Sequence, residues 1–194
     1  MIGFVVLLVG IALWAGAHMF RRLAPEARAR MGDPTDPKDK SKGLFAILIV
    51  LSIVIMVYGY RWAEFIYVWQ PPVFFTHINN LLMLLAFYTF GASAAKPAKV
   101  WLGTKIRHPQ LVAFKLWAVA HLLVNGDLAS ILLFGLLLLW AGAEVALINR
   151  AEGPWTPPQR APVRKEIVLI VVALVLFVVV ALIHNWLGVY PFGG

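Results

Sequence analysis

The sequence predicts an all-α fold: a polytopic transmembrane helical bundle with six spans, formed by a single integral membrane domain over residues 1–194. Hydrophobic residues make up 61% of the chain, and the mean hydropathy is +0.82. The apolar residues gather in six runs, and a helix needs about 20 such residues to cross a membrane. Most basic residues lie between these runs rather than inside them. This combination excludes an ordinary soluble domain.

The predicted spans cover residues 2–20, 44–68, 77–95, 109–124, 128–149 and 167–189. The first is followed, not preceded, by the basic pair Arg21 and Arg22. That order is the reverse of a secretory signal peptide, so we expect this segment to be retained as a span. The fourth is short, because about 16 residues rise only ~24 Å as a helix, and five spans are therefore the alternative.

The connections between the spans differ in character. Residues 21–42 form a polar, proline-containing loop that we do not expect to build a packed core. Residues 125–127, Asn-Gly-Asp, are typical of a tight turn, in which Asp127 caps the helix that follows.

The positive charges predict the orientation of the chain. Residues 21–42, 96–107 and 150–165 hold seven, four and four of the 17 Lys and Arg residues. These are alternate connections and share one side, so the positive-inside rule places them in the cytoplasm and both termini on the outer side. The net charge of +8 is therefore a topology signal rather than a nucleic-acid-binding surface, and the expected partner is the lipid bilayer.

A polar stretch lies in and beside the fourth predicted span. Its ionisable and amide residues include Arg107, His108, Lys115, His121, Asn125 and Asp127. Burying a polar group without a partner costs roughly 2–7 kcal/mol, so such residues are candidate functional residues. The chain has no cysteine, which excludes disulfides, iron–sulfur clusters and thiolate chemistry.

Two charges inside spans are expected to pair. Lys115 lies about two turns into its span, and Glu144 lies at a similar depth on the next one. Either charge alone would be costly in lipid. The sequence therefore predicts a Lys115–Glu144 ion pair, and the alternative is that the Lys115 side chain reaches the surface.

The segment RHPQLVAFKLWAVAHLLVNGDLASILLFG, residues 107–135, closely resembles the signature of the NnrU family. A second match is Ala17-His18 before the basic pair, and the topology also fits, so the resemblance spans most of the chain. Residues 44–95 match in hydropathy rather than by motif. The RHP element is also similar to one in isoprenylcysteine carboxyl methyltransferases. Those enzymes carry a tyrosine where Leu111 stands and a downstream Arg/Glu cofactor motif that is not evident here, which weakens a methyltransferase interpretation.

The resemblance implies a cofactor and candidate ligands. Membrane relatives of the family include the 15-cis-zeta-carotene isomerases, which bind haem b through histidines, and the matching positions are His18 and His121. These two residues are thus implied to be the axial ligands of the haem iron. Arg107 and His108 are then expected to contact haem propionates or substrate. Asn125 and Asp127 are expected to line a pocket or to form the turn.

Helix depth favours other histidine pairs. His121 lies 13 residues beyond His108, roughly 20 Å deeper along a straight helix. His18 is expected near the basic end of its own span. Depth alone would therefore pair His18 with His108, and His77 with His121, so that a His18–His121 pair requires a tilted span, a buried RHP element or a flat-lying macrocycle.

The resemblance also implies a role, since NnrU proteins are linked to nitric oxide and nitrite reduction in denitrifying bacteria. The chain is thus expected in the bacterial inner membrane. One hypothesis is a haem-dependent catalyst, including an isomerase of a lipophilic isoprenoid such as 15-cis-zeta-carotene. Another is a non-catalytic accessory or assembly subunit of a nitric oxide reductase or other respiratory complex. A small transporter is the weakest hypothesis, because no internal repeat is visible. No catalytic residue can be named from the sequence.

Overall fold

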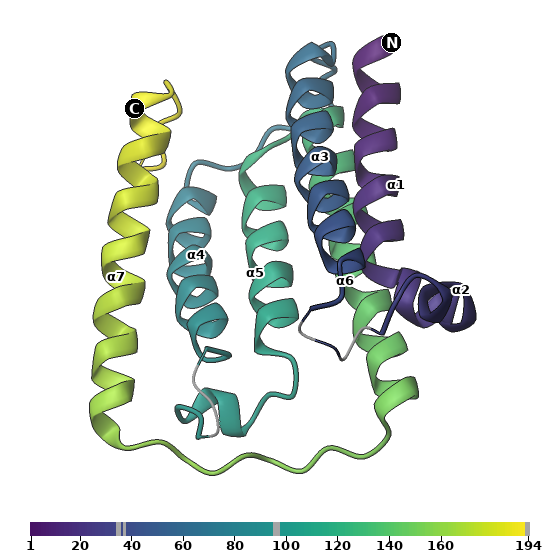
Figure 1. Ribbon diagram of the computed structural model, residues 1–194. Coiled ribbons are helices and arrows are strands. Elements are labelled where there is room, and N and C mark those ends of the chain that lie inside the picture. Colours follow the sequence, from purple (N-terminus) through teal and green to yellow (C-terminus); the bar gives the residue numbers. More distant parts are fainter. Residues whose placement is uncertain (34–35, 37, 95–97, 193–194) are drawn as a thin grey trace. The chain divides into compact units, whose positions relative to one another are not determined.

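The protein is all-helical, as predicted. A computed structural model describes residues 1–33, 36, 38–94 and 98–192. That part of the chain contains seven α-helices, one short 3-10 helix, two isolated β-bridges and no strand. The elements are α1 (Ile2–Leu23), α2 (Pro25–Arg30), α3 (Ser41–Trp62), α4 (Phe75–Gly91), η1 (Leu102–Thr104), α5 (Pro109–Val124), α6 (Leu128–Glu152) and α7 (Val163–Trp186) (Figure 1).

Each of the six predicted apolar segments overlaps one of the longer helices. Four of these, α1, α3, α6 and α7, are long and apolar enough to cross a membrane. The helix α5 is apolar but has only 16 residues, and α4 has 17. The described residues thus establish a membrane protein with four candidate spans.

The chain forms two compact units. Unit 1 comprises Met1–Val68 and Asp127–Glu152, and unit 2 comprises Trp69–Gly126 and Gly153–Gly194, of which the last two residues lie outside the described part. Unit 1 therefore holds α1, α2, α3 and α6, and unit 2 holds α4, α5 and α7. The predicted single domain over residues 1–194 stays a prediction.

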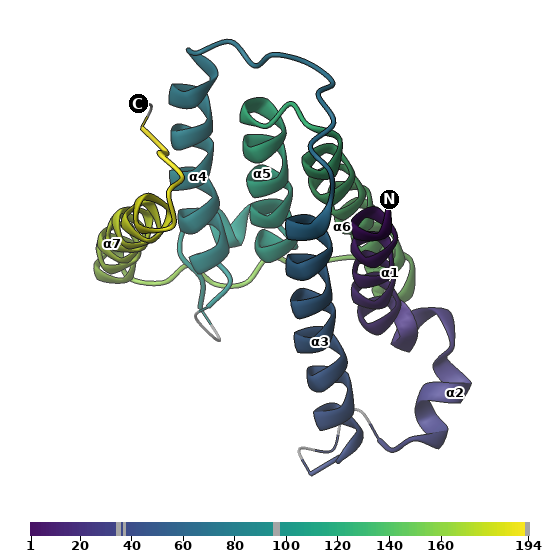
Figure 2. The same ribbon diagram turned by 90° about the horizontal axis from the view of Figure 1, so that it is seen from above.

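Unit 1 is built on close contact between α1 and α3, and α1 also packs against α6 (Figures 1 and 2). The close contact occurs at glycines. A Cβ atom added to Gly3 would lie 2.3 Å from the backbone N of Ala63, and one added to Gly59 would lie 2.3 Å from the backbone N of Leu7. Small residues let helix backbones approach in this way, and van der Waals packing of this kind drives helix association in membranes.

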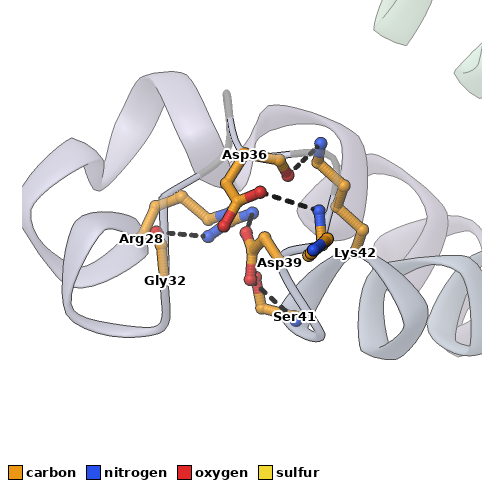
Figure 3. A network of polar contacts seen from close by, with 7 residues as sticks. Arg28, Gly32, Asp36, Asp39, Ser41 and Lys42 are labelled. Atoms are coloured by element: carbon orange, nitrogen blue, oxygen red, sulfur yellow. Dashed lines mark hydrogen bonds and ion pairs between the residues drawn. The ribbon is translucent and has the colours of Figure 1, made fainter.

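The connection between α1 and α3 corrects the expectation of a loop without a core. Arg28 of α2 is only 5% exposed. Its guanidinium donates to Asp39 Oδ2 at 2.8 Å and to the Gly32 carbonyl at 3.1 Å (Figure 3). It also lies 5.2 Å from the centre of the Phe45 ring. Asp39 also accepts from the Ser41 backbone N–H at 2.9 Å. A hydrogen-bonded ion pair thus organises a segment that composition alone indicated would not build a packed core. Residues 34, 35 and 37 lie outside the described part.

Unit 2 is built on α4, which packs against both α5 and α7. Its two basic connections are hydrogen-bonded to each other. The Lys99 backbone N–H donates to the Gln159 carbonyl at 2.9 Å, and the Ala161 N–H donates to the Lys99 carbonyl at 2.6 Å. Glu166, in the first turn of α7, accepts from the Trp101 backbone N–H at 2.8 Å and from the Tyr88 hydroxyl. Lys96, where the first of these connections was predicted to begin, lies outside the described residues.

The Asn-Gly-Asp turn depends on a glycine. The Trp69 backbone N–H donates to the Gly126 carbonyl at 3.1 Å, and a Cβ atom at Gly126 would lie 1.8 Å from the Trp69 carbonyl oxygen. On the unit 1 side, Asp127 occupies the N-cap of α6, where its Oδ1 accepts from the Ser130 backbone N–H at 2.9 Å. Its other oxygen accepts from the Ser130 hydroxyl at 2.5 Å.

Gly59→Ala is expected to lower the stability of unit 1, even though alanine is favoured over glycine in a helix by about 1 kcal/mol. The reason is the overlap of the new methyl group with the backbone of α1. Thermal unfolding in detergent measures the effect. Gly16→Ala, where an added Cβ meets nothing within 4 Å, is the matched control and should be neutral or stabilising. A Gly59→Ala protein as stable as the Gly16→Ala protein would contradict the close α1–α3 packing.

The Arg28–Asp39 pair is expected to make stability depend on pH in the acid range. Hydrogen bonds from Arg28 and then Ser41 lower the pKa of Asp39 from 3.8 to about 2. A lowered pKa means that the stabilisation is complete above the unfolded value, and that it is lost as the pH falls through the folded value. Wild type should therefore be more stable than Asp39→Asn above about pH 4. The difference in melting temperature between the two proteins should shrink to nothing near pH 2, and a constant difference across this range would count against the pair.

Candidate functional site

Three histidines on apolar helices share one hydrogen-bonding arrangement. In each, ring Nδ1 donates to the backbone carbonyl four residues earlier: His18 to Trp14 at 2.9 Å, His121 to Trp117 at 2.9 Å and His184 to Val180 at 2.8 Å. A carbonyl only accepts, so Nδ1 carries a proton, and in a neutral imidazole the lone pair is then on Nε2. A second hydrogen bond of this kind is what orients a metal-ligating histidine.

His18 belongs to an aromatic cluster in unit 1. Its ring centre lies 4.2 Å from that of Trp14, its neighbour on α1, and 5.0 Å from that of Trp140 on α6. The two indole rings are themselves 5.4 Å apart, edge to face. The imidazole is thus held by ring contacts from two helices as well as by its backbone hydrogen bond.

A buried ion pair continues this cluster one turn further along both helices. Arg22 Nη1 donates to Glu144 Oε1 at 2.8 Å, and the guanidinium also lies 3.7 Å from Glu152. Glu144 is 5% exposed, and no described residue donates a hydrogen bond to its Oε2 atom. A carboxylate, an imidazole and a guanidinium therefore lie together inside unit 1.

The observed partner of Glu144 differs from the predicted one. The sequence suggested Lys115, but Arg22 supplies the cation that contacts Glu144. Lys115 lies on α5 in unit 2, so the Lys115–Glu144 pair itself stays a prediction. Arg22 was used only as an orientation signal, because nothing local in the sequence shows that it folds back onto a helix 122 residues away.

His121 occupies the last turn of α5 in unit 2. Its ring centre lies 5.2 Å from that of Trp117, which in turn lies 5.0 Å from that of Phe114. The Asn125 amide donates to the His121 carbonyl at 2.8 Å and so covers the end of the helix. Asn125 thereby helps to form the turn.

Sequence reasoning missed His184. This histidine lies in the last turn of α7. No motif marks it, since its neighbours are Ile183 and Asn185 in an otherwise aliphatic span. Its position two residues before the end of its helix was the available signal, because it matches the place of His121 near the end of α5.

The remaining predicted residues lie at helix ends. His108 is the N-cap residue of α5, and Pro109 opens that helix. Arg107 donates to the Gly153 carbonyl at 2.6 Å, which joins the start of α5 to the connection that leads to α7. His77, at the start of α4, is exposed.

No group of three or more His, Asp or Glu side chains that could hold a metal ion occurs in the described ranges of the chain. The oriented histidines instead stand singly on three different helices. Haem needs no more than two protein ligands, so this donor set fits haem better than a metal held by side chains alone.

Four apolar helices of membrane-spanning length, joined by basic connections, define a polytopic α-helical membrane protein. The chain belongs to the NnrU family: the family model described as NnrU protein matches residues 6–191. Comparison with curated proteins and with solved structures found no match. The family match confirms the resemblance inferred from the RHP-to-LLFG segment.

Loss of either partner of the Arg22–Glu144 pair is expected to destabilise the protein strongly. Breaking a buried ion pair costs about 3–5 kcal/mol, because one charge stays buried without compensation. A double-mutant cycle with Arg22→Ala and Glu144→Ala, followed by thermal unfolding in detergent, should show a large coupling energy. The same cycle with Lys115→Ala and Glu144→Ala tests the pair predicted from sequence. Coupling confined to Lys115 would overturn the observed pairing.

Proposed function

We propose that this NnrU-family chain is a haem b-binding protein of the bacterial inner membrane that serves nitric oxide or nitrite reduction. In this proposal the six apolar helices all span the membrane, the basic connections face the cytoplasm and both termini lie on the outer side. His121 supplies one axial imidazole to the iron. The resemblance to the isomerases assigns His18 to the other axial position.

The observation that carries the proposal is the fixed orientation of His121. Its Nδ1 proton is committed to the Trp117 carbonyl at 2.9 Å, which makes Nε2 the nitrogen with the lone pair. A ligand nitrogen fixed in this way inside an apolar helix suits a hydrophobic macrocycle better than a hydrated ion. The ring contact with Trp117 adds an aromatic surface of the kind that a porphyrin packs against.

The chain's own residues have three tasks in this proposal. His18 and His121 present ligand nitrogens, and the aliphatic faces of the helices exclude water. When bound, haem iron supplies one-electron redox chemistry or a Lewis-acidic site. Arg107 is tied to the Gly153 carbonyl, so its expected contact with a propionate or a substrate would share the guanidinium with that bond.

Purified protein, expressed with adequate haem, is expected to show a Soret band and split α and β bands on reduction. His121→Ala should lose most of this absorbance. His77→Ala, an exposed histidine on α4, is the matched control and should keep it. Wild-type protein without a Soret band, at a haem supply that loads a known haem membrane protein, would refute the proposal.

Carbon monoxide binding to the reduced protein separates the two kinds of role. An accessory or electron-supplying protein with both axial positions filled should not bind the gas readily. A catalyst, including an isoprenoid isomerase, needs an open or displaceable axial position and should bind it.

Haem binding with no effect of the His121→Ala change would contradict the ligand assignment and leave the haem proposal itself standing.

A further inference from the structure

The basic connections of unit 2 are joined into one surface. The Lys99 backbone bonds the backbones of Gln159 and Ala161. The Trp101 backbone N–H donates to the Glu166 carboxylate at 2.8 Å. The segments that precede α5 and α7 are therefore held together at the end of the unit where both helices start (Figure 1). Four exposed cationic side chains lie on these segments and on the first turn of α7: Lys105, Arg160, Arg164 and Lys165.

The charge of this surface is not balanced by acidic side chains. Glu166 is the only Asp or Glu in the sequence of unit 2, which has eight Lys and Arg residues. Each Glu166 oxygen already accepts a hydrogen bond within the unit, one from the Tyr88 hydroxyl and the other from the Trp101 N–H. Within the described residues, no carboxylate forms an ion pair with any of the four exposed cations. An anion from outside the chain would supply the missing charge.

Exposed apolar side chains border these cations. The Trp101 side chain is 48% exposed, although its backbone N–H is bonded to Glu166. On α7, Val163 and Ile167 lie four residues apart and so share a face, and they are 65% and 57% exposed. Tryptophan at the end of an apolar helix is typical of the membrane–water interface. The ligand that fits this surface therefore carries both an anionic group and hydrocarbon.

We propose that this end of unit 2 binds an anionic phospholipid. The headgroup surface comprises Trp101, Lys105, Arg160, Arg164 and Lys165. Its cations bind the lipid phosphate, and the exposed aliphatic side chains of α7 contact the acyl chains. Basic surfaces at the ends of membrane helices attract anionic headgroups in this way. A soluble anion or an acidic protein segment would use the cations but not the apolar border.

This lipid site goes beyond the proposed function and does not depend on haem. It uses neither Arg107 nor any histidine. It also goes beyond the positive-inside rule, which assigns a side of the membrane to basic residues but no particular ligand.

Native mass spectrometry of the full-length protein in detergent tests the site, with phosphatidylglycerol or phosphatidylcholine of the same acyl chains as the added lipid. Wild type should prefer phosphatidylglycerol. Each cation near an anionic lipid contributes roughly fivefold to the affinity, so the double change Arg164→Gln and Lys165→Gln should weaken phosphatidylglycerol binding by roughly 25-fold. Binding of phosphatidylcholine should stay the same.

The matched control is the double change Arg21→Gln and Lys40→Gln. It also removes one exposed arginine and one exposed lysine, but from the connection between α1 and α3 in unit 1. This protein should bind phosphatidylglycerol like wild type. An equal loss in both double variants would show that net charge alone attracts the lipid, and it would overturn the assigned surface.

Trp101→Ala separates a lipid from a soluble anion, because it leaves every charge in place. It should weaken phosphatidylglycerol binding and leave the binding of glycerol phosphate unchanged. Unchanged lipid binding in this variant would contradict the apolar part of the site. Tighter binding of glycerol phosphate or of a polyglutamate peptide than of phosphatidylglycerol would overturn the proposal in favour of a soluble anion or an acidic protein.

The wild-type measurement keeps the test decisive even where a variant fails to fold. Melting temperatures in detergent identify such a variant. A folded wild-type protein that binds phosphatidylglycerol no more tightly than phosphatidylcholine would refute the proposal without any variant.

Discussion

The polar groups on the apolar helices of this protein have to find their partners within the protein, because hydrocarbon offers none. This constraint explains the most specific contacts of the structure. Arg22 reaches across to Glu144, and Tyr60 of α3 makes a 2.8 Å hydrogen bond with Ser130, which in turn donates to Asp127. The three oriented histidines bind the backbone of their own helices. Two buried oxygens, Glu144 Oε2 and Asn79 Oδ1, accept no hydrogen bond from the described residues.

The helices could be predicted well from the sequence, because hydrophobic runs report directly on length and environment. Long-range partners could not. Lys115 was chosen for Glu144 because a tight turn suggested adjacent helices, but the observed cation, Arg22, comes from the first helix of the chain. The connection that contains α2 was misjudged for a similar reason. Composition shows that this segment holds many charges, but it does not show that Arg28 bonds Asp39 and that Asp39 in turn bonds Ser41.

The candidate site was predictable where a motif marked it. The RHP-to-LLFG segment identified the family and drew attention to His121, which lies in a helix with its ring oriented for ligation. His184 carries no motif and was found only from its hydrogen bond to the Val180 carbonyl. The resemblance implies that His18 and His121 are ligands, and the structure shows that each donates a hydrogen bond from Nδ1 to the backbone of its own helix.

The most direct test of the account is the haem content of the purified wild-type protein, measured by the pyridine haemochrome method against protein concentration. The account predicts haem b at about one per chain, since the proposed function places a single haem on His121. Protein that is folded and monodisperse in detergent, yet carries no stoichiometric haem after expression with ample haem supply, would contradict it.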